Sequence, residues 1–268
     1  MVGVDSVKKE VKSLISQVKV DFARGHFDLD KNVKRPPLHM FFAGEPGTGK
    51  TTVARALGKA YSAMGALGSG EFKQIHETDP GELSGEYVTD PPKMVKQAFD
   101  AAEKSGGVLF IDEAQNFDMN SNSKAALKAM VKQMTDRDVV VIFAGYEDMP
   151  ARLAKIDSGI PSRVPKKMTF PKYRPEEKVE IGRRQLKQNG WRLASPKAEK
   201  TFRDFAGSVQ GQGRGVTQLV NLAQESARAR VGSSMGEFVT ERKVSNITDD
   251  DLVSAAKKLG IVTEEVEA

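Results

Sequence analysis

The residues with the clearest chemical meaning form one glycine-rich segment at residues 44–51. The segment matches the pattern G-x-x-x-x-G-K-[ST] at every position and reads Gly44-Glu45-Pro46-Gly47-Thr48-Gly49-Lys50-Thr51. Glycines allow backbone N–H groups to converge on phosphate oxygens, and a lysine reaches the β- and γ-phosphates. The sequence therefore predicts a nucleotide phosphate site, with Lys50 as its principal cation and the hydroxyl of Thr51 as a Mg²⁺ ligand.

A pair of carboxylates supplies the second half of this chemistry. Asp112 and Glu113 follow the apolar run at residues 108–111. A buried strand that ends in two acidic residues places Asp112 beside Mg²⁺, while Glu113 can orient or deprotonate an attacking water. Such a run also occurs by chance, but here it lies downstream of a complete phosphate loop. Glu113 therefore predicts hydrolysis of the nucleotide and not binding alone.

The surrounding elements must place these groups together. A short apolar run at residues 38–43 leads into the phosphate loop, and a helix pattern covers residues 50–64. The runs at 107–111 and 139–143 have the length and β-branched content of buried strands. Because buried strands here alternate with helices, we expect an α/β fold with a mostly parallel sheet.

The pattern changes near residue 170, where strand signals largely stop. Helix patterns follow at residues 175–188, 196–207, 215–231 and 249–259. We predict an α/β nucleotide domain over residues 1–170, a smaller all-α domain over 171–262 and an acidic tail at 263–268. Nearer the N-terminus, apolar spacing predicts a helix at residues 5–20, and the stretch 24–37 reads as a loop.

Composition limits the other functions. The chain has 268 residues and a net charge of +5, from 41 Lys and Arg against 36 Asp and Glu, so its charge alone predicts no nucleic acid partner. It has no cysteine, which excludes a disulfide framework and a thiolate nucleophile, and its three histidines lack metal-ligand spacing. No apolar run approaches the roughly 20 residues that cross a bilayer. We therefore expect no membrane insertion and a cytoplasmic location.

With these motifs in place, the chain resembles the AAA+ ATPases, in particular the group that contains red-type Rubisco activase and the ATPases of type VII secretion and stage V sporulation. The resemblance runs from Gly3 to about Leu259, and its distinctive pieces are residues 38–42, 107–114, 144–146 and 170–173. It implies a P-loop NTPase with a three-layer parallel sheet and a helical lid. It further implies ATP and Mg²⁺ as ligands, a homo-oligomer expected to be a hexamer, and a protein client.

The resemblance also implies roles for residues outside the motifs. Gly3 and Val4 pack against the adenine in this family, and Arg214 matches an arginine of the lid that senses nucleotide. Arg163 matches an arginine that reaches the γ-phosphate of the neighbouring subunit, while Pro161 replaces a second arginine that relatives usually have. Together, motif and resemblance give these nucleotide-contacting residues: Gly3, Val4, Glu45, Pro46, Gly47, Thr48, Gly49, Lys50, Thr51, Thr52 and Arg214.

Tyr87 and Val88 lie where the family carries its central pore loop. An aromatic side chain beside a branched apolar one can hold an extended peptide, whereas a nucleic-acid motor would use lysine or arginine. The alternative is that Tyr87 covers the core beneath its own loop.

Three functions remain open. The leading hypothesis is an ATP-hydrolysing subunit of a ring that remodels or threads proteins. A nucleotide-switched assembly scaffold with little turnover is the alternative, because Pro161 leaves the arginine pair incomplete. A clamp-loader or helicase-like motor on nucleic acid is disfavoured by Tyr87, Val88 and the modest charge.

Overall fold

A computed structural model describes residues 2–26, 38–67, 71–85, 87, 89–233 and 240–261. The chain divides into two compact units. The sheet unit comprises Asp5–Glu45 and Gly49–Pro171, and the helical unit comprises Met1–Val4, Pro46–Thr48 and Lys172–Ala268. Each unit is built around its own buried apolar cluster.

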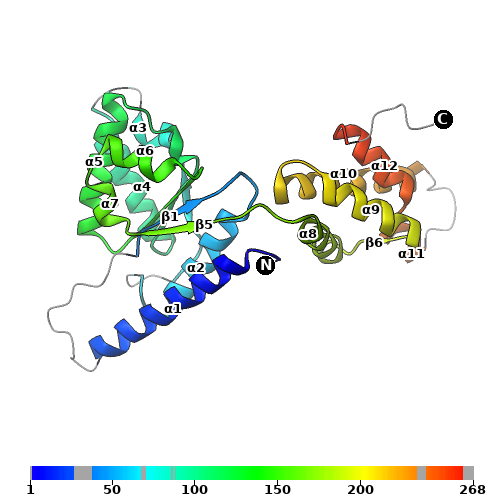
Figure 1. Ribbon diagram of the computed structural model, residues 1–268, viewed down its shortest axis with the longest axis horizontal. Helices are drawn as coiled ribbons and strands as arrows, with labels where there is room; N and C mark the ends of the chain where they lie inside the picture. The colour runs from blue at the N-terminus through cyan, green and yellow to red at the C-terminus, as the bar shows by residue number, and fades with distance from the viewer. Residues whose placement is uncertain are drawn as a thin grey trace. The chain divides into compact units, whose positions relative to one another are not determined.

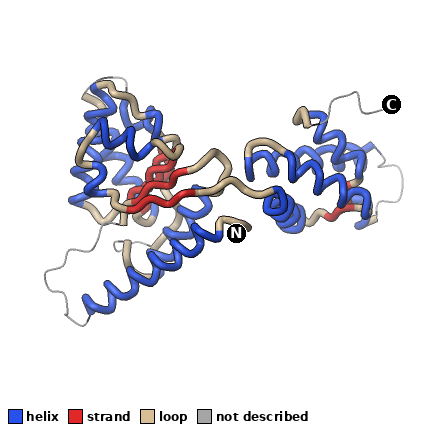
Figure 2. Tube along the Cα trace, in the orientation of Figure 1, coloured by secondary structure: helices blue, strands red, loops and turns tan. Residues whose placement is uncertain are grey.

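The sheet unit contains five parallel strands in the order β2-β3-β4-β1-β5. Figure 1 labels β1 and β5 of this sheet, and Figure 2 shows strands in red. The strands are β1 Met40–Ala43, β2 His76–Thr78, β3 Val108–Ile111, β4 Val140–Gly145 and β5 Lys166–Thr169. Every residue of β1, β3 and β4 is buried, as expected for strands covered on both faces. The register pairs Ala43 with Gly145, so β1 and β4 end at the same level of the sheet.

Helices cover both faces of this sheet (Figure 1). They are α1 Asp5–His26, α2 Lys50–Ala63, α3 Pro80–Ser84, α4 Pro91–Ser105, α5 Ser121–Asp136, α6 Met149–Ile156 and α7 Ile160–Arg163, with the 3₁₀ turn η1 at Ala114–Asn116. Successive residues of β1 face opposite layers. Phe41 packs on Phe143 with ring centroids 5.7 Å apart, and Phe42 packs on Phe170 at 4.9 Å. This alternation gives the sheet two apolar faces and the unit three layers.

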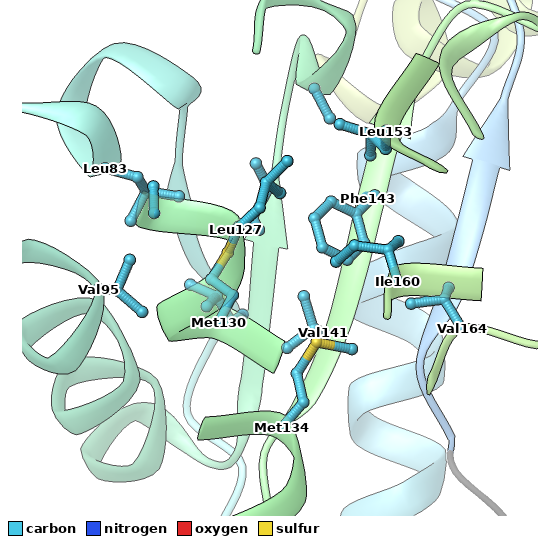
Figure 3. Packing of buried hydrophobic residues seen from close by; sticks show 14 of the residues in the cluster. Leu83, Val95, Leu127, Met130, Met134, Val141, Phe143, Leu153, Ile160 and Val164 are labelled. Atoms are coloured by element: carbon cyan, nitrogen blue, oxygen red, sulfur yellow. The ribbon is translucent and has the colours of Figure 1, made fainter. Parts of the chain in front are cut away.

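The larger core lies between β4 and helices α3 to α7. Leu127 and Met130 of α5 point toward Val141 and Phe143 of β4 (Figure 3). All four side chains are fully buried. Because each such side chain contributes about 1.5–3 kcal/mol on burial, this cluster fixes α5 on the sheet and with it the loops at the carboxyl edge of the strands.

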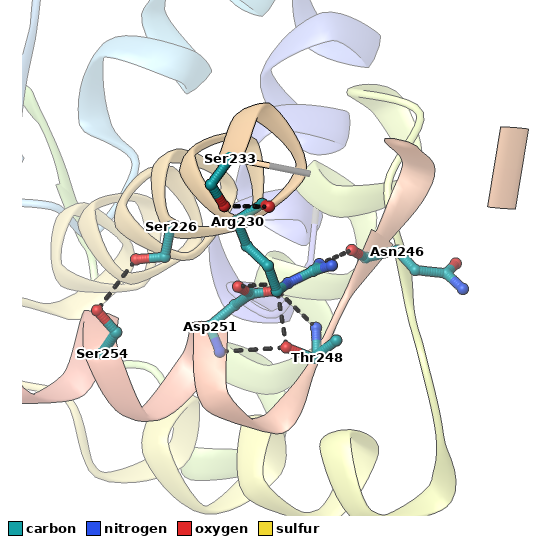
Figure 4. Close-up of polar contacts among 7 residues, drawn as sticks. All are labelled: Ser226, Arg230, Ser233, Asn246, Thr248, Asp251 and Ser254. Carbon is teal, nitrogen blue, oxygen red and sulfur yellow. Dashed lines mark hydrogen bonds and ion pairs between the residues drawn. The ribbon is translucent and has the colours of Figure 1, made fainter. Parts of the chain in front are cut away.

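The helical unit packs four longer helices around a second core. Its elements are α8 Pro175–Gln188, β6 Arg192–Leu193, α9 Pro196–Ser208, α10 Gln212–Ser233, α11 Glu241–Ser245, β7 Asn246–Ile247 and α12 Asp249–Lys258. Arg230 of α10 joins α12 to this core, because its guanidinium contacts the buried carboxylate of Asp251 at 2.9 Å and the backbone oxygen of Asn246 at 3.0 Å (Figure 4). Thr248 and Asp251 form a capping box that starts α12.

The predicted fold class is confirmed, with corrections in detail. The helix predicted at residues 5–20 extends to His26, so the predicted loop at 24–37 was wrong for residues 24–26, and residues 27–37 lie outside the described chain. The prediction of an all-α C-terminal region missed the two-residue strands β6 and β7, which pair in parallel. The functional division at residue 170 stays a prediction, and the tail at 263–268 lies outside the described residues.

Candidate nucleotide site

The phosphate loop connects the end of β1 to the start of α2. Gly49 is the residue before α2, with φ 92°, and no side chain caps the helix N-terminus there. The first N–H groups of a helix have no intrahelical partner and carry the positive end of the helix dipole. Because no side chain occupies them, they are available to phosphate oxygens.

Two glycines of the loop are required by its geometry. Gly47 has φ 78°, a left-handed conformation that other residues rarely adopt. A Cβ at Gly44 would lie 2.6 Å from the backbone oxygen of Phe170, closer than real Cβ contacts allow. The loop therefore has the bare, tightly turned backbone that a phosphate group needs, and its residues fit a nucleotide.

Lys50 is the buried cation of this loop. Its side chain folds back so that Nζ donates to the backbone oxygens of Gly44 at 2.7 Å and Glu45 at 3.0 Å. Lys50 is only 8% exposed. An ammonium held within the loop by carbonyl oxygens is placed to meet phosphate charge without a large movement of the backbone.

Asp112 and Glu113 lie at the carboxyl end of β3, one strand away from β1 across β4. The N–H of Asp112 donates to Thr78 O at 2.9 Å, and the N–H of Glu113 donates to Asp112 Oδ1 at 3.0 Å. Since parallel strands end at a common edge, both carboxylates share the edge of the sheet that β1 and the phosphate loop occupy. The structure thus brings the two sequence motifs to one edge.

The donor set at this edge suits Mg²⁺. Within the described parts of the chain, no three His, Cys, Asp or Glu side chains gather as a metal cage. Mg²⁺ is usually held by one or two protein oxygens together with waters and substrate phosphates. The Thr51 hydroxyl and the Asp112 carboxylate match that pattern, and their role as ligands stays a prediction.

Gln115 is a site residue that sequence reasoning missed. It lies in η1, is 5% exposed, and donates from Nε2 to Glu113 Oε2. Its Oε1 accepts the backbone N–H of Tyr146 at 3.3 Å. The sequence offers only a weak signal for it, a polar residue two positions after Glu113.

Arg163 is the last residue of α7, and its hydrogen bonds within the described chain are to other residues of the sheet unit and not to the phosphate loop. Its Nε donates to Thr135 Oγ1 at 3.1 Å, and its Nη1 donates to Ser162 Oγ at 3.1 Å and to Gly159 O at 3.4 Å. Among the described residues, these hydrogen-bond partners are all neutral oxygens, and none of them belongs to a carboxylate.

Three of the remaining predicted nucleotide contacts, Gly3, Val4 and Arg214, belong to the helical unit. Arg214 lies in the first turn of α10, and the adjacent Gly213 donates its N–H to Gly47 O at 3.0 Å. Gly3 and Val4 both have positive φ, 61° and 50°, and Val4 is 5% exposed. Their contacts with adenine or phosphate stay predictions, as does the role of Thr52, an exposed residue of α2.

Tyr87 is exposed in the segment between α3 and α4. Its side chain is 70% exposed, which contradicts the alternative that it covers the core. Two hydrogen bonds join Tyr87 to Asp90, since Tyr87 N donates to Asp90 Oδ2 at 3.0 Å and Asp90 N donates to Tyr87 O at 3.0 Å. Val88 lies outside the described residues.

A second exposed apolar side chain, Met119, lies just before α5, which is hydrogen-bonded to the segment that precedes Tyr87. Met119 is 59% exposed and precedes α5. Asn122, at the start of α5, donates from Nδ2 to Gly85 O at 3.3 Å. Sequence reasoning missed Met119, because a single methionine in a polar loop gives no pattern.

The parallel sheet, the complete phosphate loop and the Asp-Glu pair define a P-loop nucleotide-binding protein. Residues 40–172 match the "ATPase family associated with various cellular activities (AAA)". The chain is 32% identical to "Ribulose bisphosphate carboxylase/oxygenase activase, chloroplastic" of Cyanidioschyzon merolae, over 99% of this chain and 84% of the relative. It therefore belongs to the AAA family of ATPases, in the group that includes this activase.

Other relatives support the same assignment. The chain is 31% identical to "Stage V sporulation protein K" of Bacillus subtilis, covering 94% of this chain and 79% of that one. It is 30% identical to "ESX-3 secretion system protein EccA3" of Mycobacterium tuberculosis, over 96% of this chain but 44% of the relative. The crystal structure of the FIGL-1 AAA domain in complex with ADP superposes with a TM-score of 0.65 at 20% identity, covering 96% of this chain and 82% of that one, which shows the shared fold.

Membership of this family implies nucleotide binding and, in general, ATP hydrolysis. The helices in the described part of the chain include none with the length and apolar character of a membrane span.

Proposed function

We propose that the chain is an ATP-hydrolysing subunit of a ring-forming motor that remodels or threads a protein client. The observation that carries the proposal is the meeting of two motifs at one sheet edge. Lys50 lies inside a loop shaped for phosphate, and Glu113 lies across β4 with its carboxylate held by a hydrogen bond. A binding protein needs only the first of these features, whereas a hydrolase needs both.

Each residue of the site has one task in this proposal. Lys50 and the amides of the loop bind the phosphates, and Thr51 and Asp112 hold Mg²⁺. Bound Mg²⁺ would supply neutralisation of the negative charge that develops on the phosphate oxygens. Glu113 accepts a proton from the attacking water and fixes the direction of attack.

Arg163 supports assembly into a ring. Within the described chain, its guanidinium donates hydrogen bonds to hydroxyl and carbonyl oxygens. In phosphoryl-transfer enzymes, an arginine supplied by a neighbouring subunit stabilises the transition state and raises kcat by several orders of magnitude. A head-to-tail contact that delivers it closes into a ring when the rotation permits, and six subunits are the expected number.

The proposed client is a polypeptide gripped by Tyr87 and Val88. The exposure of Tyr87 supports this proposal, because a large exposed aromatic side chain, with its backbone N–H bonded to Asp90, can pack on any extended chain. The names of the relatives refer to those proteins and do not identify a client for this chain.

A nucleotide-switched scaffold is the second candidate. Pro161 is the observation that favours it, since it stands in α7 where the resemblance leads us to expect another arginine. A scaffold would bind ATP and assemble but turn over ATP slowly.

ATP turnover measured with three additions separates these candidates: none, an unfolded protein, and single-stranded nucleic acid. The motor predicts turnover that rises several-fold with the unfolded protein only. Turnover stimulated only by nucleic acid would contradict the protein client, and the absence of any turnover beside tight ATP binding would favour the scaffold.

A further inference from the structure

A buried amide bridges the ends of two neighbouring strands beside the proposed base. Gln115 contacts Glu113, just beyond β3, and Tyr146, just beyond β4. We infer that Gln115 is a positioning residue that fixes the carboxylate of Glu113 and couples its direction to the end of β4. The inference rests on the proposed hydrolysis of ATP, and it assigns a role that neither sequence motif covers.

The partners of Gln115 determine which end of the amide faces Glu113. A carboxylate accepts hydrogen bonds and a backbone N–H donates them. Nε2 therefore faces Glu113 Oε2, and Oε1 faces the N–H of Tyr146. The reverse orientation would set oxygen against oxygen and N–H against N–H. The amide has one orientation, so it can impose one direction on Glu113.

Glu113 needs such an external contact. Its φ is 49°, a left-handed conformation that is uncommon in residues other than glycine, and it lies between the end of β3 and η1. Regular secondary structure thus does not set the direction of its side chain. Gln115 donates to one carboxylate oxygen, Oε2, and in the proposed mechanism the other oxygen, Oε1, accepts the proton of the attacking water.

Gly145 supplies independent evidence that the fold leaves space for the Gln115 amide at this position. A Cβ at Gly145 would overlap Gln115 Oε1, well inside the closest real contacts. Gly145 is not among the glycines with positive φ, so its backbone does not demand glycine. The missing side chain makes room for the amide, and Gln115 fills that room with 5% of its surface exposed.

The first test compares Gln115→Leu with Asn116→Ala, a control at the exposed neighbouring amide of η1. Gln115→Leu should lower kcat by about 10- to 100-fold with the KM for ATP unchanged, because a small misplacement of a catalytic group costs up to about 100-fold. Asn116→Ala should match wild type. An unchanged kcat in Gln115→Leu, or a change confined to KM, would overturn the inference.

A double-mutant cycle tests the coupling to β4. Gly145→Ala should lower kcat in the wild-type background by displacing the amide, and should add little in a Gln115→Ala background. Equal effects in the two backgrounds would contradict coupling through Gln115. If wild type itself lacks turnover, the proposed function fails; if wild type turns over, Glu113→Gln does not, and Gln115→Leu equals wild type, only the positioning role fails.

Discussion

Lys50 and Glu113 show how far local spacing determines a site. The lysine and its glycines lie within eight residues, so the motif alone predicts a glycine-rich loop that surrounds Lys50. The same is true of the carboxylate pair, because both residues directly follow one strand. Gln115 differs, since its second partner, Tyr146, is 31 residues away along the chain. A contact of that kind depends on strand order, which one short motif cannot reveal.

Tyr87 gives a prediction at this scale. Tyr87→Ala should leave basal ATP hydrolysis within a few-fold of wild type, because the phosphate loop and Glu113 are untouched. It should abolish work on a protein client, since the aromatic ring that it removes from every subunit contributes roughly 0.5–1.5 kcal/mol beyond its buried area. The measurements are phosphate release and unfolding of a fluorescent client by the same preparation.

Thermal unfolding provides the control for Tyr87→Ala. A side chain that is 70% exposed should change the melting temperature little, whereas removal of a core aromatic costs roughly 3–5 kcal/mol. A strongly destabilised variant, or one that still unfolds its client, would contradict the proposed grip.

At the scale of secondary structure, the buried strands were predictable and the edge strands were not. β1, β3 and β4 are continuous apolar runs, so composition and length identify them. β2 and β5 lie at the two edges and contain polar residues, with sequences HET and KKMT. β2 and β5 are strands because their backbones pair with an inner strand, and such a long-range contact cannot be predicted from local sequence. The two-residue strands of the helical unit were missed for the same reason.

His39 connects three elements and predicts a pH dependence. Its Nδ1 accepts the N–H of Val141 in β4 at 3.0 Å, and its Nε2 lies 3.3 Å from Met134 O at the end of α5. Desolvation by burial lowers the pKa of His39 from 6.5 to about 4, although the contact with Met134 opposes the shift. A neutral imidazole with Nε2 protonated satisfies both partners.

The sign of the effect follows from this lowered pKa. Between about pH 6.5 and 4 the unfolded chain binds a proton at His39 that the folded chain does not, so stability falls as pH falls through this window. From pH 7.5 to 5, wild type should lose about 2 kcal/mol more unfolding free energy than His39→Gln. Urea unfolding at both pH values measures this difference.

His76→Gln is the matched histidine control for this measurement. It should keep the pH dependence of wild type, because His39 is still present. A loss of stability on acidification that is the same in wild type and His39→Gln would show that His39 is not its source.

At the scale of the whole molecule, Arg163 predicts a site completed by a second copy of the chain. Arg163→Ala and Lys50→Ala should each turn over ATP at least about 10³-fold more slowly than wild type. The first variant lacks the arginine that a subunit supplies to its neighbour, and the second does not bind the nucleotide. Mixed rings should regain activity, because a Lys50→Ala subunit still supplies Arg163 to its neighbour.

Random mixing at equal amounts should make about one quarter of the interfaces productive. Light scattering with ATP checks that both variants assemble. Assembled mixed rings that remain inactive would contradict an arginine supplied in trans, and a strict monomer at high concentration would contradict the ring.

Phosphate release from ATP by Glu113→Gln tests the central claim most directly. Glu113→Gln should bind ATP as tightly as wild type by calorimetry, because the phosphate loop is intact, yet release phosphate at least about 100-fold more slowly, because the base is lost. Lys50→Ala should fail to bind, while Lys59→Ala, at an exposed lysine of the same helix, should bind normally. Equal rates of phosphate release by Glu113→Gln and wild type would contradict the account.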